Sequence, residues 1–160
     1  MQSAQLVAPQ RVELRTMEDP PTPGPDEVLV RLREVGLCGS DMHWYAEGSI
    51  AGISADYPMV LGHEPAGEIE DVGPGVERLR PGARVAVEPA ISCGVCVNCS
   101  VGHFNLCTES LFMGGFPIPG LLREYAVVPA RNVDVVPDAM SLTEAVIVEP
   151  LAVLLHTFEL

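Results

Sequence analysis

The stretch "VLVRLREVGLCGS", residues 28–40, has the clearest structural signal in the chain. Apolar residues fall at every second position and basic residues occupy positions between and after them: Val28, Val30, Leu32, Arg31 and Arg33. A period of two is typical of a β-strand with one face buried and the other in solvent. The predicted strand runs directly into Cys38, a residue type that can bind a metal.

The rest of the chain indicates a fold that is mainly β. Fifteen glycines and fifteen prolines are spread between short apolar runs, which favours short strands joined by turns over a helical bundle. We predict further strands in "AGEIEDV" (66–72), in "RPGARVAVEP" (80–89) and twice in "LLREYAVVPARNVDVVP" (121–137). Such a succession predicts a barrel or a sandwich.

The C-terminal segment has helical signals instead. Ser141 and Glu144 have the spacing of a capping box, which predicts a short helix over residues 142–149. Pro150 suits the first turn of a second helix. Apolar residues recur along one face of that helix, at Leu151, Leu154, Leu155 and Phe158.

The length and net charge of the chain exclude several classes of protein. A chain of 160 residues can bury roughly 70% of its unfolded surface, enough for one domain with its own core. The net charge of -13 opposes binding to nucleic acid and to anionic membranes. The N-terminal residues do not resemble a secretory signal, and no apolar run is long enough to span a membrane. We therefore expect a cytoplasmic protein, in a compartment where disulfides are rare.

Four of the five cysteines lie together in "ISCGVCVNCSVGHFNLC", residues 91–107. Cys93, Cys96 and Cys99 are separated by two residues each, and Cys107 follows after seven more. This spacing favours a tetrahedral zinc site with all four positions filled by protein, which stabilises a loop. An iron–sulfur cluster is the nearest alternative, although its usual run continues with a shorter gap and a proline. The other alternative is that these cysteines form disulfides or are free thiols.

The other candidate ligands form a mixed set: Cys38, His63 and Glu64 in "LGHEPAG", and Glu149 before Pro150. Each alone is more often an ordinary buried or solvated residue. Together, a sulfur, an imidazole and carboxylates are typical of catalytic zinc, which keeps one position open for water or substrate.

Four segments of the sequence resemble the zinc-dependent medium-chain dehydrogenases and reductases, and among them the sorbitol or polyol dehydrogenases. They are "GLCGSDMHWY", "YPMVLGHEPAGEIEDVGPGV", "RPGARVAVEPAISCGVCVNCSVGHFNLC" and "IVEPLAVLLH". The resemblance implies a GroES-like, partly open β-barrel over residues 1–149 with a zinc-binding lobe at about 91–110. Residues 150–160 would begin a helix that links this domain to a Rossmann domain.

The resemblance also implies roles for individual residues. Cys38, His63 and Glu64 would hold the catalytic zinc, with Glu149 as a fourth ligand or the partner of a zinc-bound water. Ser40 would be the hydroxyl of a proton relay and His43 its outer member. Cys93, Cys96, Cys99 and Cys107 would hold the structural zinc. Trp44 would either wall the substrate pocket or belong to the core.

The implied reaction is oxidation of a secondary alcohol or polyol to a ketone, through a zinc-bound alkoxide and hydride transfer to NAD or NADP. We find no Gly-x-Gly-x-x-Gly after a strand, so we expect the cofactor domain to lie outside these residues and the chain alone to be inactive. We also expect a homo-oligomer for the full-length enzyme and a small-molecule substrate. The alternatives are a threonine or other secondary-alcohol dehydrogenase, a non-catalytic zinc module, and a quinone-reductase-like relative without zinc.

Overall fold

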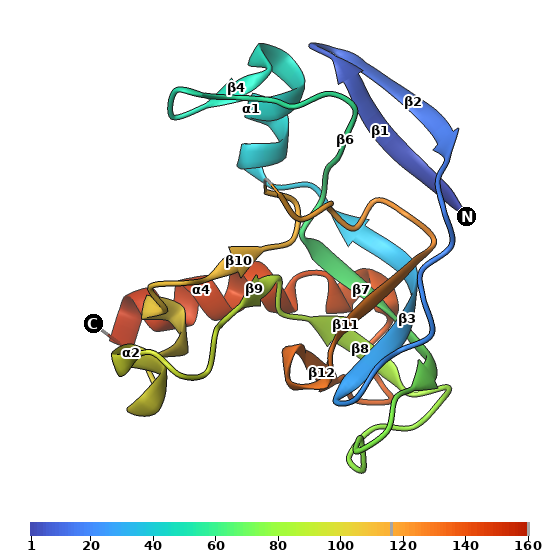
Figure 1. The fold of residues 1–160 in the computed structure, drawn as a ribbon, viewed down its shortest axis with the longest axis vertical. Helices are drawn as coiled ribbons and strands as arrows, with labels where there is room; N and C mark the ends of the chain where they lie inside the picture. The colour runs from blue at the N-terminus through green and yellow to red at the C-terminus, as the bar shows by residue number, and fades with distance from the viewer. Residues whose placement is uncertain (116, 160) are drawn as a thin grey trace.

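A five-stranded antiparallel sheet forms the centre of the protein (Figure 1). The computed structural model describes residues 1–115 and 117–159. In sheet order, the strands are β11 (Tyr125–Pro129), β3 (Glu27–Gly36), β7 (Glu64–Val72), β8 (Arg84–Val87) and β12 (Val133–Val135). Within the described residues β11 and β12 do not pair with each other, so the barrel is not closed. The predicted fold, mainly β with a partly open barrel, is confirmed.

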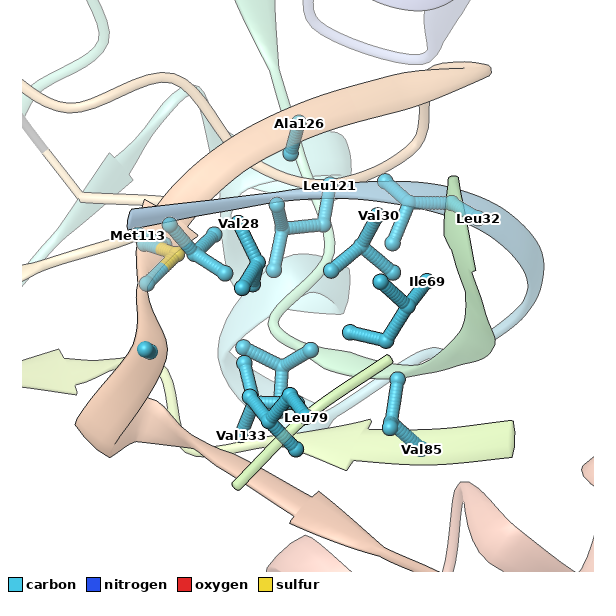
Figure 2. Close-up of a cluster of buried hydrophobic side chains, with 13 residues drawn as sticks. Val28, Val30, Leu32, Ile69, Leu79, Val85, Met113, Leu121, Ala126 and Val133 are labelled. Atoms are coloured by element: carbon cyan, nitrogen blue, oxygen red, sulfur yellow. The ribbon is translucent and has the colours of Figure 1, made fainter. Parts of the chain in front are cut away.

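The buried face of the sheet has the residues that the alternation predicts. Val28 and Val30 are fully buried and Leu32 is 9% exposed, whereas Arg33 is exposed and pairs with Glu68. Figure 2 shows these β3 side chains and those of neighbouring segments pointing into one space. The rest of this core is Ile69, Leu79, Val85, Val87, Met113, Leu121, Ala126, Val128, Ala130 and Val133. Because one face is buried, the register of β3 against β7 is fixed.

An N-terminal hairpin was not predicted. Strands β1 (Gln2–Ala8) and β2 (Arg11–Thr16) pair antiparallel, and β1 also pairs with β6 (Met59–Val60). The sequence did contain a signal for it, because Val12 and Leu14 alternate with charged residues. In the structure the two strands are joined by a turn at Gln10, whose φ is 61°. Leu6 of β1 is fully buried, so the hairpin is anchored to the rest of the domain.

A helix that was also not predicted follows β3. Helix α1 (Gly39–Glu47) begins after Cys38 and ends at Gly48, whose φ of 65° suits glycine. The short strands β4 (Ser49–Ile50) and β5 (Ile53–Ser54) follow it. Trp44 is 8% exposed and packs with Leu6 and Leu61, which places it in a second core.

The C-terminal helices differ in their bounds from the prediction. Ser141 and Glu144 form the predicted capping box, with Ser141 N–H donating to Glu144 Oε2 at 2.8 Å. However, α3 (Leu142–Ala145) is shorter than predicted, and α4 (Val148–Glu159) begins two residues before Pro150. The reason is that proline is tolerated anywhere in the first turn, where its missing N–H has no partner. Of the predicted linking segment 150–160, Leu160 lies outside the described residues.

The cysteine-rich segment forms a lobe that leaves the domain and returns at the same place. Its base is the antiparallel pair β9 (Ala90–Ile91) and β10 (Leu111–Phe112). Between them lie α2 (Val97–Ser100) and the 3-10 helix η1 (Phe104–Leu106). In Figure 1 the lobe lies beside the C-terminal end of α4, and Asn105 Nδ2 is 3.1 Å from His156 Nε2 of that helix.

No helix in the described part of the chain is long and apolar enough to cross a membrane; α4 has 12 residues.

Candidate metal centres

The four cysteines of the lobe bring their sulfur atoms to one point. The sulfurs of Cys93, Cys96, Cys99 and Cys107 all lie within 4.8 Å of one another, and those of Cys93 and Cys99 are 4.0 Å apart. Four sulfurs around a tetrahedral zinc, with bonds of about 2.3 Å, are separated by about 3.8 Å. The donor set and its spacing therefore fit zinc, and none of the five cysteines forms a disulfide.

Backbone N–H groups stabilise thiolates in this lobe. The N–H of Cys93 donates to Cys107 Sγ at 3.2 Å, and that of Cys96 donates to Cys93 Sγ at 3.3 Å. The N–H groups of Cys99 and Thr108 lower the pKa of Cys96 to about 5. Burial raises the pKa of Cys99 to about 12. The lobe thus favours a negative charge at one sulfur, whereas Cys99 needs a bound cation to ionise near neutral pH.

A second cluster of donor atoms lies at the start of β7. Three donor atoms lie within 4.8 Å of one another: Cys38 Sγ, a ring nitrogen of His63 and a carboxylate oxygen of Glu64. Cys38 is the residue before α1, His63 precedes β7, and Glu64 is the first residue of β7. Two strands and a helix N-terminus therefore bring together residues that are 25 positions apart. This donor set suits a zinc ion with an open position.

Asp41 supports this cluster and was missed by the sequence analysis. The residue is 1% exposed, and its carboxylate accepts hydrogen bonds from the N–H of Cys38 at 3.0 Å and of Gly62 at 2.9 Å. Asp41 Oδ2 also lies 3.6 Å from His63 Nδ1. Because Nδ1 faces Asp41, Nε2 is the nitrogen left for a metal. An acid three residues after Cys38, in the capping-box position, was the available signal.

Phe112 connects the base of the lobe to the second cluster. Its ring lies 5.1 Å from the His63 ring, centroid to centroid, at a tilt of 59°. Gly62, with φ of 87°, and Gly114 allow the two chain segments to approach, because a Cβ on Gly114 would lie 3.1 Å from Gly62 O. His63 is therefore held between Asp41 on one side and an aromatic ring on another.

Glu149 lies close to the second cluster but not within it. It is in the first turn of α4, half-buried, and its donor atoms are not among those that meet within 4.8 Å. Burial raises the pKa of its carboxyl; His63 opposes that shift, and Glu64 and Glu88 add to it. Glu149 thus belongs to the same electrostatic environment as His63 and Glu64.

The structure does not join Ser40 and His43. Ser40 is half-buried in the first turn of α1, two residues after Cys38. His43 is exposed, and its Nδ1 lies 3.2 Å from Glu47 Oε1. Among the described residues no hydrogen bond links the two side chains, so a relay between them needs a bridging molecule such as water.

Comparison with known proteins gives a consistent result. Residues 24–138 match the alcohol dehydrogenase GroES-like domain. The sorbitol dehydrogenase of Bacillus subtilis (strain 168) is 42% identical over 131 residues, which are 82% of this chain and 37% of that protein. The L-idonate 5-dehydrogenase of Vitis vinifera is 45% identical over 136 residues, 85% of this chain and 37% of that protein.

A solved structure shares the fold. Galactitol-1-phosphate dehydrogenase from Escherichia coli superposes with a TM-score of 0.89 at 34% identity, covering 99% of this chain and 44% of that one. The chain thus spans about two fifths of the relatives that it matches. Because the matched domain covers most of its length, this protein belongs to the alcohol dehydrogenase GroES-like domain family, within the zinc-dependent medium-chain dehydrogenases and reductases.

Proposed function

We propose that this chain is the catalytic-domain portion of a zinc-dependent oxidoreductase that oxidises a secondary alcohol or polyol to a ketone, with hydride transfer to NAD or NADP. The observation that carries the proposal is the convergence of Cys38, His63 and Glu64 on one point. Three mixed donors leave a fourth position for substrate, whereas the four sulfurs of the lobe do not. The relatives named as a sorbitol dehydrogenase and an L-idonate 5-dehydrogenase, whose named substrates both carry several hydroxyl groups, support the substrate class.

In this proposal Cys38, His63 and Glu64 hold the catalytic zinc, and Glu149 is a fourth ligand or the partner of a zinc-bound water. Zinc, when bound, supplies a Lewis acid that lowers the pKa of an alcohol. Asp41 keeps the His63 ring oriented and its Nε2 free for the metal. The buried position of His63 limits the access of water to its ring.

Proton removal is assigned to Ser40 and His43. Ser40 lies two residues after Cys38, in the first turn of α1, and in this proposal its hydroxyl accepts a proton from an alcohol at the open position and passes it outward. His43 is exposed and can exchange that proton with solvent. Because the two side chains do not touch, the proposed path includes a water or a substrate hydroxyl between them.

The remaining assignments concern the larger protein. We assign residues 1–149 to the catalytic domain and 150–160 to the start of the link to a dinucleotide-binding domain, which would supply NAD or NADP. The lobe, with Cys93, Cys96, Cys99 and Cys107, would hold a structural zinc. The full-length enzyme would act as a homo-oligomer on a small-molecule alcohol.

Metal content and cobalt spectroscopy test the proposal. We expect two zinc ions per chain by native mass spectrometry, one after Cys38→Ser, and a Co(II)-substituted second site whose visible spectrum changes on adding sorbitol or a simple secondary alcohol. The control is Cys96→Ser, in which the alcohol-sensitive spectrum should persist. A second site that binds cobalt but does not respond to any alcohol would favour the non-catalytic zinc module instead.

A further inference from the structure

Gly36 occupies an unexpected position for a glycine. It is the last residue of β3, and it lies directly opposite Glu64 in the antiparallel pairing with β7. Residues opposite each other in such a pair project to the same face of the sheet. The Glu64 side chain therefore shares a face with the position where a Gly36 side chain would be.

The backbone at this position does not require glycine. Gly36 is not among the residues with positive φ, so its conformation is open to any amino acid. Glycine in a strand weakens the strand and often marks a place where another group approaches closely. The reason for glycine must therefore lie in the space beside it.

That space is filled by Glu64. A Cβ built on Gly36 would overlap Glu64 Oε2, and it would lie 3.0 Å from Glu64 Cβ and 3.3 Å from Glu64 Cδ. All of the closest atoms belong to this one side chain. The Glu64 carboxylate thus lies across β3 at Gly36, and the same carboxylate meets Cys38 Sγ and the His63 ring within 4.8 Å.

We propose that Gly36 is a positioning residue of the second metal site: its missing side chain is the space through which the Glu64 carboxylate reaches Cys38 and His63. The inference rests on the proposed function of that site. A side chain at position 36 overlaps the carboxylate end of the Glu64 side chain first, and relief of the 3.0 Å contact with Glu64 Cβ needs a shift of only a few tenths of an ångström between the two strands. The fold should therefore survive the substitution while the carboxylate leaves the cluster.

Gly39 offers a matched control three residues away. A Cβ on Gly39 would meet nothing within 4 Å, and its φ is not positive. Gly39 is also the first residue of α1, where alanine is a better helix former than glycine. Gly36→Ala and Gly39→Ala therefore make the same chemical change on either side of Cys38, with and without an obstacle.

The test compares metal binding in the wild-type chain, Gly36→Ala and Gly39→Ala, by chelator competition and by the visible spectrum of the Co(II)-loaded second site. We expect Gly36→Ala to keep the lobe zinc and the melting temperature of the wild type. Its second site should bind zinc at least tenfold more weakly, with an altered Co(II) spectrum. Gly39→Ala should match the wild type in both measurements.

A double variant distinguishes an effect that acts through the Glu64 carboxylate from a general effect on strand β3. In a Glu64→Ala background, Gly36→Ala should change the affinity of the second site by less than about twofold, because the displaced group is already gone. Equal affinity and an identical spectrum in Gly36→Ala and wild type would overturn the inference, as would misfolding or loss of both metals in Gly36→Ala. A wild-type chain that binds only one metal would instead overturn the proposed function.

Discussion

The two candidate metal centres are built in opposite ways. The lobe takes four identical donors from 15 consecutive residues, 93–107, and its sulfurs are held by backbone N–H groups of the same segment. The second cluster takes a sulfur, an imidazole and a carboxylate from two distant segments, and it depends on β3, β7 and α1 to bring them together. A site encoded locally can be predicted from spacing, whereas a site assembled by the fold cannot.

The two centres also differ in how deeply the residues around them are buried. Within the lobe only Cys99 is buried, and most of the residues around the cysteines are exposed. In the second cluster His63 is 6% exposed and Asp41 is 1% exposed. Metal binding should therefore be the main source of order in the lobe, while the second site should be largely preformed by packing.

The largest expected effect is loss of the lobe. Replacing Cys96 by serine removes one of four sulfurs and leaves a segment with almost no buried side chains of its own, so residues 92–110 should lose their fixed structure. We expect one zinc ion fewer by native mass spectrometry, rapid proteolysis within the lobe, and an unchanged second site. Cys38→Ser is the matched control and should leave the lobe resistant to protease.

Two outcomes of that experiment would break the comparison. If Cys96→Ser also emptied the second site, the two centres would be coupled, and Phe112, which joins the lobe base to His63, would be the route. If elemental analysis found iron in place of zinc, the interpretation of the lobe as a structural zinc site would be wrong.

The same contrast explains which features the sequence predicted. The alternation from Val28 to Leu32 and the capping box at Ser141 are local patterns, and both agree with the structure. Helix α1 was missed because "GLCGS" contains two glycines and reads as a turn, although Asp41 caps the helix through the N–H of Cys38. The break between α3 and α4 was predicted at Pro150 but lies at Val146 and Ile147, because apolar residues continue through these two positions without a visible stop.

The candidate site residues show a similar division. The candidate ligands of the lobe follow from spacing alone. Cys38, His63 and Glu64 were first grouped by residue type, and their roles came from the resemblance to a family, since nothing local links position 38 to position 63. Asp41 had only the signal of a capping-box position, and the role of Gly36 could not be recognised without the structure. Their roles depend on contacts across strands and loops: Asp41 accepts from Gly62, and Gly36 leaves space for Glu64.

A smaller effect is expected from Asp41, and it probes how far packing preforms the second site. Asp41→Ala leaves the buried N–H of Gly62 and the partly buried N–H of Cys38 without their acceptor, which costs about 1–3 kcal/mol of folding free energy for each group that water does not reach. Loss of a group that orients a histidine ligand lowers metal affinity by roughly 10- to 100-fold.

Urea unfolding and zinc competition measure the two effects of Asp41 separately. Asp41→Asn retains one acceptor oxygen and should recover part of the stability, but less of the affinity, because the negative charge beside His63 Nδ1 is gone. Asp56→Asn, at an exposed aspartate, is the control and should change neither quantity. Normal zinc affinity in Asp41→Ala would show that the second site does not depend on this carboxylate.

The smallest effect is expected at the capping box of α3, a local sequence feature outside the two candidate metal centres. Hydrogen bonds from the Ser141 N–H and hydroxyl lower the pKa of Glu144 below its usual 4.5. A carboxyl whose pKa is lower in the folded state stabilises the protein above its unfolded pKa, and this contribution disappears as the pH falls through the folded value. Glu144→Gln should therefore lower the melting temperature slightly at pH 7 and by less at pH 3. Because Glu144 is exposed, we expect a difference of a few degrees at most, measured against Glu109→Gln, an exposed glutamate of the lobe. An equal loss at both pH values would mean that the ionised carboxylate of Glu144 does not stabilise the start of α3. The position of that start would then depend on packing against other segments, as the arrangement of the second cluster does.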